Sequence, residues 1–113
     1  MSVDVTHAPT HGTAPVVTAA RWPVAGQDRS EISGAHATMR HVTVKAGHVA
    51  GRHHHDFEQF LFVVSGSATL RCEQGTIPLE PGTGLHLQPG AWHSAEFRTE
   101  TVLLEVNVDR PAA

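Results

Sequence analysis

The segment GHVAGRHHHDFEQFLFVV, residues 47–64, combines a cluster of metal-ligand side chains with a long run of strand-forming residues. Side chains alternate between the two faces of an extended strand, so the potential ligands divide by the parity of their numbers. One face carries His53, His55 and Gln59, and the other carries His54, Asp56 and Glu58. This alternation selects Gln59 rather than Glu58 as the third candidate ligand.

A second segment, Pro89-Gly90-Ala91-Trp92-His93, provides a turn followed by one more imidazole at the start of another strand. A histidine run could instead form a solvated loop or be a purification tag, but tags lie at chain termini and this run lies in mid-chain. We therefore predict that His53, His55 and His93 converge with Gln59 on one metal ion. The alternative is a centre held by the three histidines alone.

The spacing of these residues resembles the two sequence motifs of the cupin superfamily. The first motif is matched by Gly47, His53, His55, Gln59 and Gly66, with glutamine where the family usually has glutamate. The second is matched by Gly82, Pro89, Gly90 and His93, although Gln88 replaces a proline and Phe97 replaces a frequent asparagine. The likeness covers residues 47–93, and flanking strands extend it to about 35–108. It implies a small single-domain metal-binding protein of the cupin_2 type, folded as a jelly-roll β-barrel.

The composition fits one domain in a reducing compartment. A chain of 113 residues can build one core but is too short for two domains. The net charge of −3 and the scattered basic residues argue against nucleic acid as the main partner. Cys72 is the single cysteine, which rules out an intrachain disulfide. Without a signal-like or membrane-spanning run, we expect a soluble cytoplasmic protein with no membrane partner.

Turn signals recur about every eight residues and no helical stripe is visible, which predicts an all-β antiparallel sandwich or barrel. We expect a flexible N-terminal arm or swapped edge strand over residues 1–20, the barrel over 21–109 and a tail over 110–113. The first strand signals are Val16-Val17 and Arg21-Trp22-Pro23-Val24. Further strands are predicted over 35–45, from 48 without a break to 64, and over 68–73, 76–80, 83–88, 92–97 and 101–108.

Catalysis has few candidate bases. The chain contains no tyrosine, so the tyrosine base of cupin lyases with similar ligand spacing is excluded. A base must come from His41, His54, Glu58, Glu105 or metal-bound hydroxide. We favour the hydroxide and name Glu105 and His41 as the candidate catalytic side chains.

The candidate pocket residues are Arg40, His41, Trp92 and Phe97. The strand over 35–45 alternates, so Arg40 or His41 points into a cavity unless both face solvent. Trp92 could stack on a planar substrate or simply pack. Glu105 and Asn107 share one face of the last strand, which we interpret as a solvated exterior, with a polar pocket as the alternative.

The predicted ligands suit one divalent transition metal ion, namely Zn, Ni, Fe, Mn or Cu. Because these ligands are neutral, the ion keeps its double charge, which favours Lewis-acid over oxidative chemistry. The leading hypothesis is a metal-dependent isomerase, cyclase or lyase that acts on a small molecule in specialised metabolism. The alternatives are a metal-dependent dioxygenase and a non-catalytic ligand-binding or sensor protein.

The resemblance also bears on assembly. Cupin relatives commonly pair through an outer sheet, and Phe60, Phe62 and the N-terminal arm offer apolar surface for such pairing. We therefore expect a homodimer.

Overall fold

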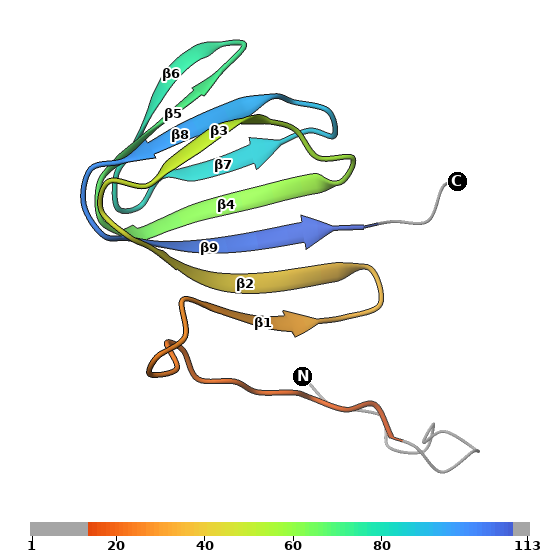
Figure 1. Cartoon of the computed structure of the whole chain (residues 1–113). Coiled ribbons are helices and arrows are strands. Elements are labelled where there is room, and N and C mark those ends of the chain that lie inside the picture. The colour runs from red at the N-terminus through yellow and green to blue at the C-terminus, as the bar shows by residue number, and fades with distance from the viewer. Residues whose placement is uncertain (1–13, 110–113) are drawn as a thin grey trace.

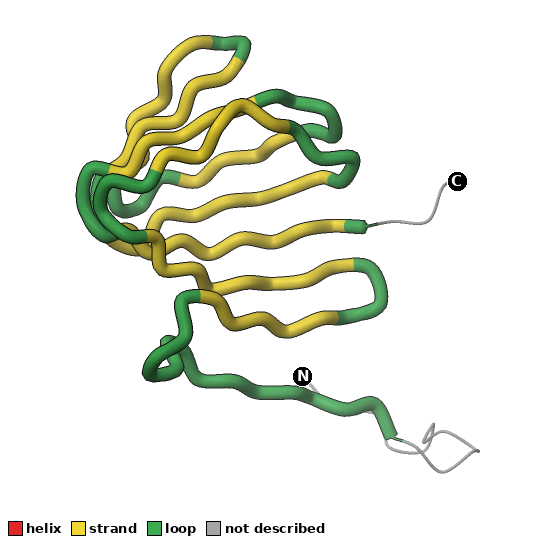
Figure 2. The backbone as a smooth tube through the Cα atoms, viewed as in Figure 1, coloured by secondary structure: helices red, strands yellow, loops and turns green. Residues whose placement is uncertain are grey.

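The computed structural model describes residues 14–109, and within that range the protein consists of strands, turns and irregular segments (Figure 2). The strands are β1 (Arg29–Ser33), β2 (Ala37–Val44), β3 (Val49–His53), β4 (Glu58–Ser65), β5 (Ala68–Cys72), β6 (Gly75–Leu79), β7 (Gly84–Leu87), β8 (His93–Phe97) and β9 (Thr101–Val108). The all-β prediction is confirmed. In the described range, no helix has the length and apolar character needed to span a membrane.

Two antiparallel sheets form the two layers of the fold. One has the strand order β1-β2-β9-β4-β7, and the other has the order β3-β8-β5-β6 (Figure 1). The chain moves between the sheets after β2, β3, β4, β6, β7 and β8, so most strands that are consecutive in sequence belong to different layers. This exchange between layers is typical of a jelly roll, as predicted.

Strand β4 shows how the sequence specifies the layers. Along its length, Gln59, Leu61 and Val63 are buried, whereas Phe60 and Phe62 keep 44% and 45% of their surface exposed. The alternation means that one face of the five-stranded sheet covers the interior and the other is an apolar outer surface. The structure thus agrees with the two-sided apolar pattern of the sequence.

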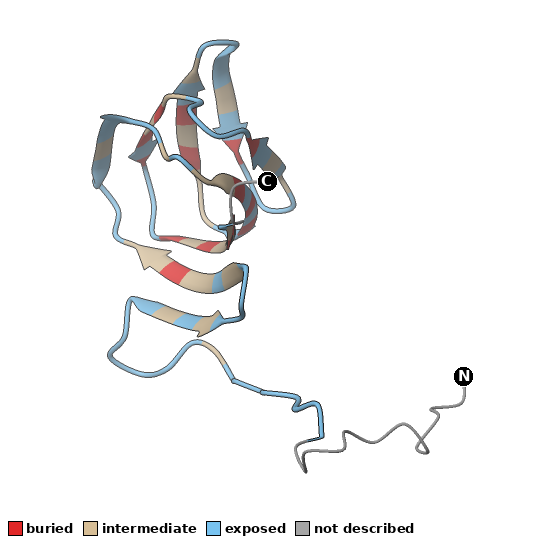
Figure 3. Ribbon diagram, turned by 90° about the vertical axis from the view of Figure 1, so that its right-hand side faces the viewer, coloured by how far each residue is buried: buried red, intermediate tan, exposed pale blue. Residues whose placement is uncertain are grey.

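The core fills the space between the layers, and Figure 3 shows how the buried positions are distributed along the strands. It is built from both sheets by Leu61, Val63, Ala68, Leu70, Leu79, Leu87, Ala95, Phe97 and Leu103. The interior also contains a cavity that polar side chains and core residues line together. This cavity contains the candidate site.

A tight turn between β4 and β5 depends on Gly66. Its φ is +96°, and a Cβ added there would lie 2.5 Å from the Glu100 carbonyl oxygen and 2.5 Å from the Cα and Oγ1 of Thr101. Thr101 is completely buried. Glycine at this position therefore permits both the backbone conformation and the close approach of the β8–β9 connection.

The N-terminal strand signals were wrong. Residues 14–28 form no strand, although strands were predicted at Val16-Val17 and 21–24. Within residues 14–109 the first strand is β1, which pairs with β2 and was not predicted. Pro23 and Gly26 disfavour a strand in the segment before β1, whereas residues 29–33 lie beside β2 and pair with it. Most of the expected arm and the tail fall on residues 1–13 and 110–113, outside the described range.

The segment 48–64 is not one strand, contrary to the prediction. β3 ends at His53 in the four-stranded sheet, residues 54–57 are irregular, and β4 begins at Glu58 in the other sheet. The parity argument therefore does not run continuously from His53 to Gln59. Gln59 faces the interior because of its own position in β4, where it alternates with Phe60.

Candidate metal centre

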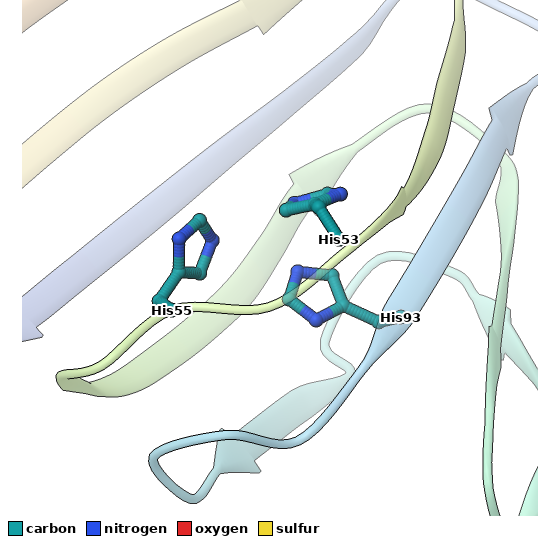
Figure 4. A group of neighbouring side chains, drawn as sticks. All are labelled: His53, His55 and His93. Carbon is teal, nitrogen blue, oxygen red and sulfur yellow. The ribbon is translucent and has the colours of Figure 1, made fainter.

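Three imidazoles meet where β3 and β8 lie side by side (Figure 4). His53 ends β3, His93 begins β8, and the two residues are paired directly across the ladder. His55 follows two residues after His53 in the segment that leads to β4. One nitrogen from each ring lies within 4.8 Å of the others. Pairing between distant parts of the sequence thus brings His93 to the other two.

The rings are close but not stacked on one another. The centroid of His53 is 4.2 Å from that of His93 and 5.0 Å from that of His55, and the planes cross at 61° and 70°. The His55 and His93 centroids are 5.3 Å apart. His55 also stacks on Phe57, with a centroid separation of 4.7 Å. Steeply inclined rings can direct nitrogen lone pairs to a shared point, which stacked rings cannot.

Hydrogen bonds define which nitrogens are available. The Nδ1 of His53 donates to the Gly51 carbonyl at 2.6 Å, and the Nδ1 of His93 donates to the Ala91 carbonyl at 3.1 Å. A carbonyl can only accept, so each of these Nδ1 atoms carries the proton and each Nε2 keeps its lone pair. Backbone carbonyls are common partners of metal-binding histidines because they fix the tautomer and the ring orientation.

The environment also favours neutral imidazoles. Burial lowers the pKa of His55, and the nearby His53 and His93 lower it further. Burial likewise lowers the pKa of His93, against the opposing effect of its hydrogen bond to Ala91. A neutral imidazole is the form that binds a metal. The donor set and its protonation therefore fit a divalent transition metal ion.

These pKa shifts predict how metal affinity depends on pH. Because the folded pKa values lie below the ordinary value of 6.5, the neutral forms contribute stability above that pH, and this contribution is lost as the pH falls through the folded values. Protons then compete with the metal for the same lone pairs. We expect metal affinity to fall at least about tenfold between about pH 7.5 and about pH 5. Competition with a chelating indicator would measure it, and an unchanged affinity would contradict histidine ligation.

Gln59 and Asn107 form a buried pair on the opposite sheet. They face each other across β4 and β9, with 6% and 8% of their surfaces exposed, and the Nε2 of Gln59 donates to the Oδ1 of Asn107 at 2.9 Å. This bond uses the amide nitrogen of Gln59 and leaves its Oε1 as the available acceptor. Asn107 thus holds the Gln59 amide in place, and both side chains line the same cavity as the histidines. Coordination by Gln59 stays a prediction.

The imidazoles and Gln59 line one cavity of about 250 Å³. Its polar lining also includes Arg29, Arg40 and Glu105, and its apolar lining consists mainly of core residues together with Val42, Val44 and Phe57. This volume lies below the roughly 300–1,000 Å³ typical of sites for drug-sized ligands. The cavity therefore suits a compact ligand.

Glu105 is the carboxyl group within this cavity. Burial raises its pKa, and the positive charges of Arg29 and Arg40 partly oppose that effect. The sequence had favoured a solvated exterior for Glu105 and Asn107, and this was wrong because their face of β9 is the inner one, shared with Leu103. Glu105 is thereby available to ligands at the site.

The predicted pocket residues divide into two groups. Arg40 and Phe97 line the cavity, whereas His41 and Trp92 do not. His41 follows Arg40 in β2 and so points to the other face, where its ring centroid is 6.0 Å from that of Trp22. Pairing of β2 with β9 places Arg40 opposite Glu105 and thereby decides which side is inside.

Trp92 takes part in a surface cluster instead. Its Nε1 donates to the Oε2 of Glu73 at 2.9 Å, and the guanidinium carbon of Arg52 lies 4.0 Å from its ring centroid. These contacts support the packing interpretation of Trp92 rather than stacking on a substrate.

Arg29 and Asn107 are among the cavity residues that were not predicted from the sequence. Arg29 could have been found from the alternation of charged residues over Arg29–Ser33, but the short strand lacks an apolar face that would reveal it. Asn107 was noticed beside Glu105, but its bond to Gln59 depends on the pairing of β4 with β9.

Comparison with known proteins identifies the architecture. The family model described as "Cupin domain" matches residues 40–107. No curated protein matches the sequence. Among solved structures, a cupin protein from Bacteroides fragilis has a TM-score of 0.68 and 18% identity, covering 87% of this chain and 90% of that chain.

Two further similar structures belong to proteins with specific names. KdgF from Halomonas sp. has a TM-score of 0.68 and 18% identity, covering 81% of this chain and 90% of that one. Ectoine synthase from P. lautus has a TM-score of 0.65 and 16% identity, covering 71% of this chain and 62% of that one. At these identities the likeness establishes a shared fold.

Proposed function

This chain belongs to the cupin domain family, and from that premise we propose that it is a metal-dependent enzyme that acts on a small molecule by Lewis-acid chemistry. The reaction would be an isomerisation, a cyclisation or a lyase reaction. One observation carries the proposal. Three imidazoles with nitrogens within 4.8 Å of one another open onto a cavity that also holds a desolvated carboxyl group.

The metal would be held by His53, His55 and His93, with Gln59 as the fourth ligand. A divalent ion bound there supplies Lewis acidity, which polarises an oxygen of the substrate. Because all four side chains are neutral, they leave the charge of such an ion uncompensated. This favours substrates with anionic or electron-rich oxygens and disfavours higher oxidation states, which is why we prefer non-redox chemistry.

Glu105 is the group that we assign to proton transfer. It lines the same cavity as the histidines, and burial raises its pKa toward the range in which a carboxyl group can both accept and donate a proton. The other candidate side chain, His41, lies on the opposite face of β2 and does not line the cavity. Of the two side chains named as candidate bases, we therefore retain Glu105 and not His41.

The hydrogen-bonded pair of Gln59 and Asn107 forms another polar part of the cavity lining. The Gln59–Asn107 bond fixes one amide, while the apolar residues around it limit the water that can surround a bound substrate. The occurrence of the same fold in a protein named ectoine synthase supports catalysis as a use of this architecture. The reaction of this chain still has to be argued from its own site.

The proposal is tested by proton exchange, because isomerases, cyclases and lyases of this kind commonly remove a proton beside a carbonyl. Protein purified without added metal is first analysed for its metal content. It is then incubated in D₂O with a panel of small hydroxyketones and 2-oxo acids, and NMR follows loss of the proton beside the carbonyl. We expect exchange that a chelator abolishes and that Glu105→Gln slows at least about 100-fold.

Glu96→Gln is the matched control, because Glu96 is exposed on β8 and does not line the cavity. Exchange should be unchanged in that variant. Oxygen consumption in place of exchange would replace the proposal with a dioxygenase. Binding of panel compounds without exchange would replace it with a binding or sensor protein.

We also propose that the protein is a homodimer formed through the outer face of the five-stranded sheet. Met39, Phe60, Phe62 and Val64 expose 41%, 44%, 45% and 44% of their surfaces there. Phe60 and Phe62 line a shallow apolar groove with Leu104 and Val106. An apolar sheet face of this kind is commonly covered by a second subunit.

Sedimentation velocity at micromolar concentration tests this assembly. We expect a dimer for the natural chain and a monomer for Phe62→Glu, because a charge at the centre of the interface would have to be desolvated. Val49→Glu is the control, since Val49 is 64% exposed on the other sheet. A natural chain that sediments as a monomer would overturn the dimer proposal.

A further inference from the structure

We propose that the cavity selects a small monocarboxylate, whose carboxylate is bound by Arg29 and Arg40 while another oxygen of the same molecule reaches the histidine centre. A monocarboxylate would be the substrate class of the proposed enzyme, and only its contact with the histidine centre rests on the proposed function. The two arginines lie on β1 and β2, on the sheet that faces the histidines.

The register of the sheet determines which charges line the cavity. Glu31, Arg40 and Glu105 are aligned across β1, β2 and β9, since Arg40 is paired with both of the others. Arg29 is paired with the inward-facing Val42 and lines the cavity beside this row. The row therefore presents alternating charges, with a second guanidinium next to it.

The guanidinium of Arg40 retains donors for a ligand. Its Nε donates to the Oε2 of Glu31 at 2.9 Å, which fixes the side chain and leaves the two terminal nitrogens. Terminal guanidinium nitrogens form the fork that binds a carboxylate through two parallel hydrogen bonds. Arg40 lines the same cavity as the three histidines. One compact molecule can therefore contact both.

The balance of charge favours a carboxylate over a phosphate. Two arginines, Arg29 and Arg40, are accompanied by two carboxyl groups, Glu31 and Glu105. Burial favours the neutral form of Glu105, so Glu31 compensates one of the two positive charges and one remains for a monoanion. A dianionic phosphate would carry more negative charge than the remaining arginine charge can compensate. The cavity volume of about 250 Å³ limits the rest of the molecule to a short chain or a single ring.

The experiment compares salicylate with salicylamide, which have nearly the same shape but differ in charge. Titration calorimetry measures the binding of each probe to the metal-loaded protein and to protein treated with a chelator. We expect salicylate to bind at least about tenfold more tightly than salicylamide in both forms, and phenyl phosphate to bind more weakly than salicylate. Equal binding of salicylate and salicylamide would overturn the inference.

Variants identify the source of the preference. Arg29→Gln and Arg40→Gln should each reduce the preference for salicylate to a few-fold or less, whereas Arg40→Lys should keep part of it because the charge remains. Arg71→Gln is the matched control, because Arg71 is exposed on β5 and does not line the cavity. Arg29 is also exposed, so its replacement tests the inference even if Arg40→Gln unfolds the protein.

The same samples separate this inference from the proposed function. Metal content is measured for every variant, and the arginine variants should retain the metal. Protein that holds no metal but prefers salicylate through its arginines would overturn the function and support the inference. Protein that holds metal and shows exchange, but binds both probes equally, would overturn the inference and support the function.

Discussion

Replacing His93 by alanine is expected to lower metal affinity at least about 100-fold. His93 supplies one of three nitrogens that lie within 4.8 Å of one another, and it is the buried member paired directly with His53. Its removal leaves two imidazoles from one short segment, which cannot enclose an ion from a second side. Metal content after dialysis and competition with a chelating indicator measure the loss.

The control is His54→Ala, which removes an imidazole from between His53 and His55. His54 lies outside the group of three and does not line the cavity. We expect its replacement to change metal affinity by less than about threefold, because it neither binds nor orients the ion. If His54→Ala and His93→Ala had equal effects, the run of histidines would be acting as a non-specific chelating segment.

Replacing Gly66 by alanine is expected to destabilise the protein by about 3–5 kcal/mol, a large fraction of the stability of a small domain. At a φ of +96°, any side chain pays a conformational penalty of about 1–3 kcal/mol. A Cβ would also lie 2.5 Å from backbone and side-chain atoms of Glu100 and the buried Thr101. Relieving this overlap requires movement of the β8–β9 connection, which costs a similar amount.

Gly82→Ala separates these two effects. Gly82 has a similar φ of +92°, but a Cβ there would meet nothing within 4 Å. We expect this variant to lose only the conformational part, about 1–2 kcal/mol. Urea denaturation of both variants measures the difference. Equal losses would mean that the close approach to Thr101 has no energetic consequence.

The fold and the histidine centre were accessible from the sequence for different reasons. Turn residues and alternating apolar residues predicted β2 and β5–β9 to within a few residues, because each of these strands carries its own local signal. The sequence merged β3 and β4 into one strand, because no strong turn signal separates them. The histidine spacing and its resemblance to a known family led to His53, His55 and His93 as one group. The missed strand β1 has no apolar stripe, so local pattern could not distinguish it from a loop.

What the sequence determined by itself is the set of strands β2 and β5–β9 and the segments that hold the imidazoles. It could not determine which face of each strand is inside. The alternation of side chains places Arg40 and His41 on opposite faces of one strand, and Glu105 and Leu104 on opposite faces of another. It does not say which of the two faces is buried. Only the pairing of β2 with β9 and of β9 with β4 turns Arg40, Glu105 and Asn107 toward the histidines. Those pairings join residues far apart in the chain, so the polar wall of the cavity is a property of the tertiary structure.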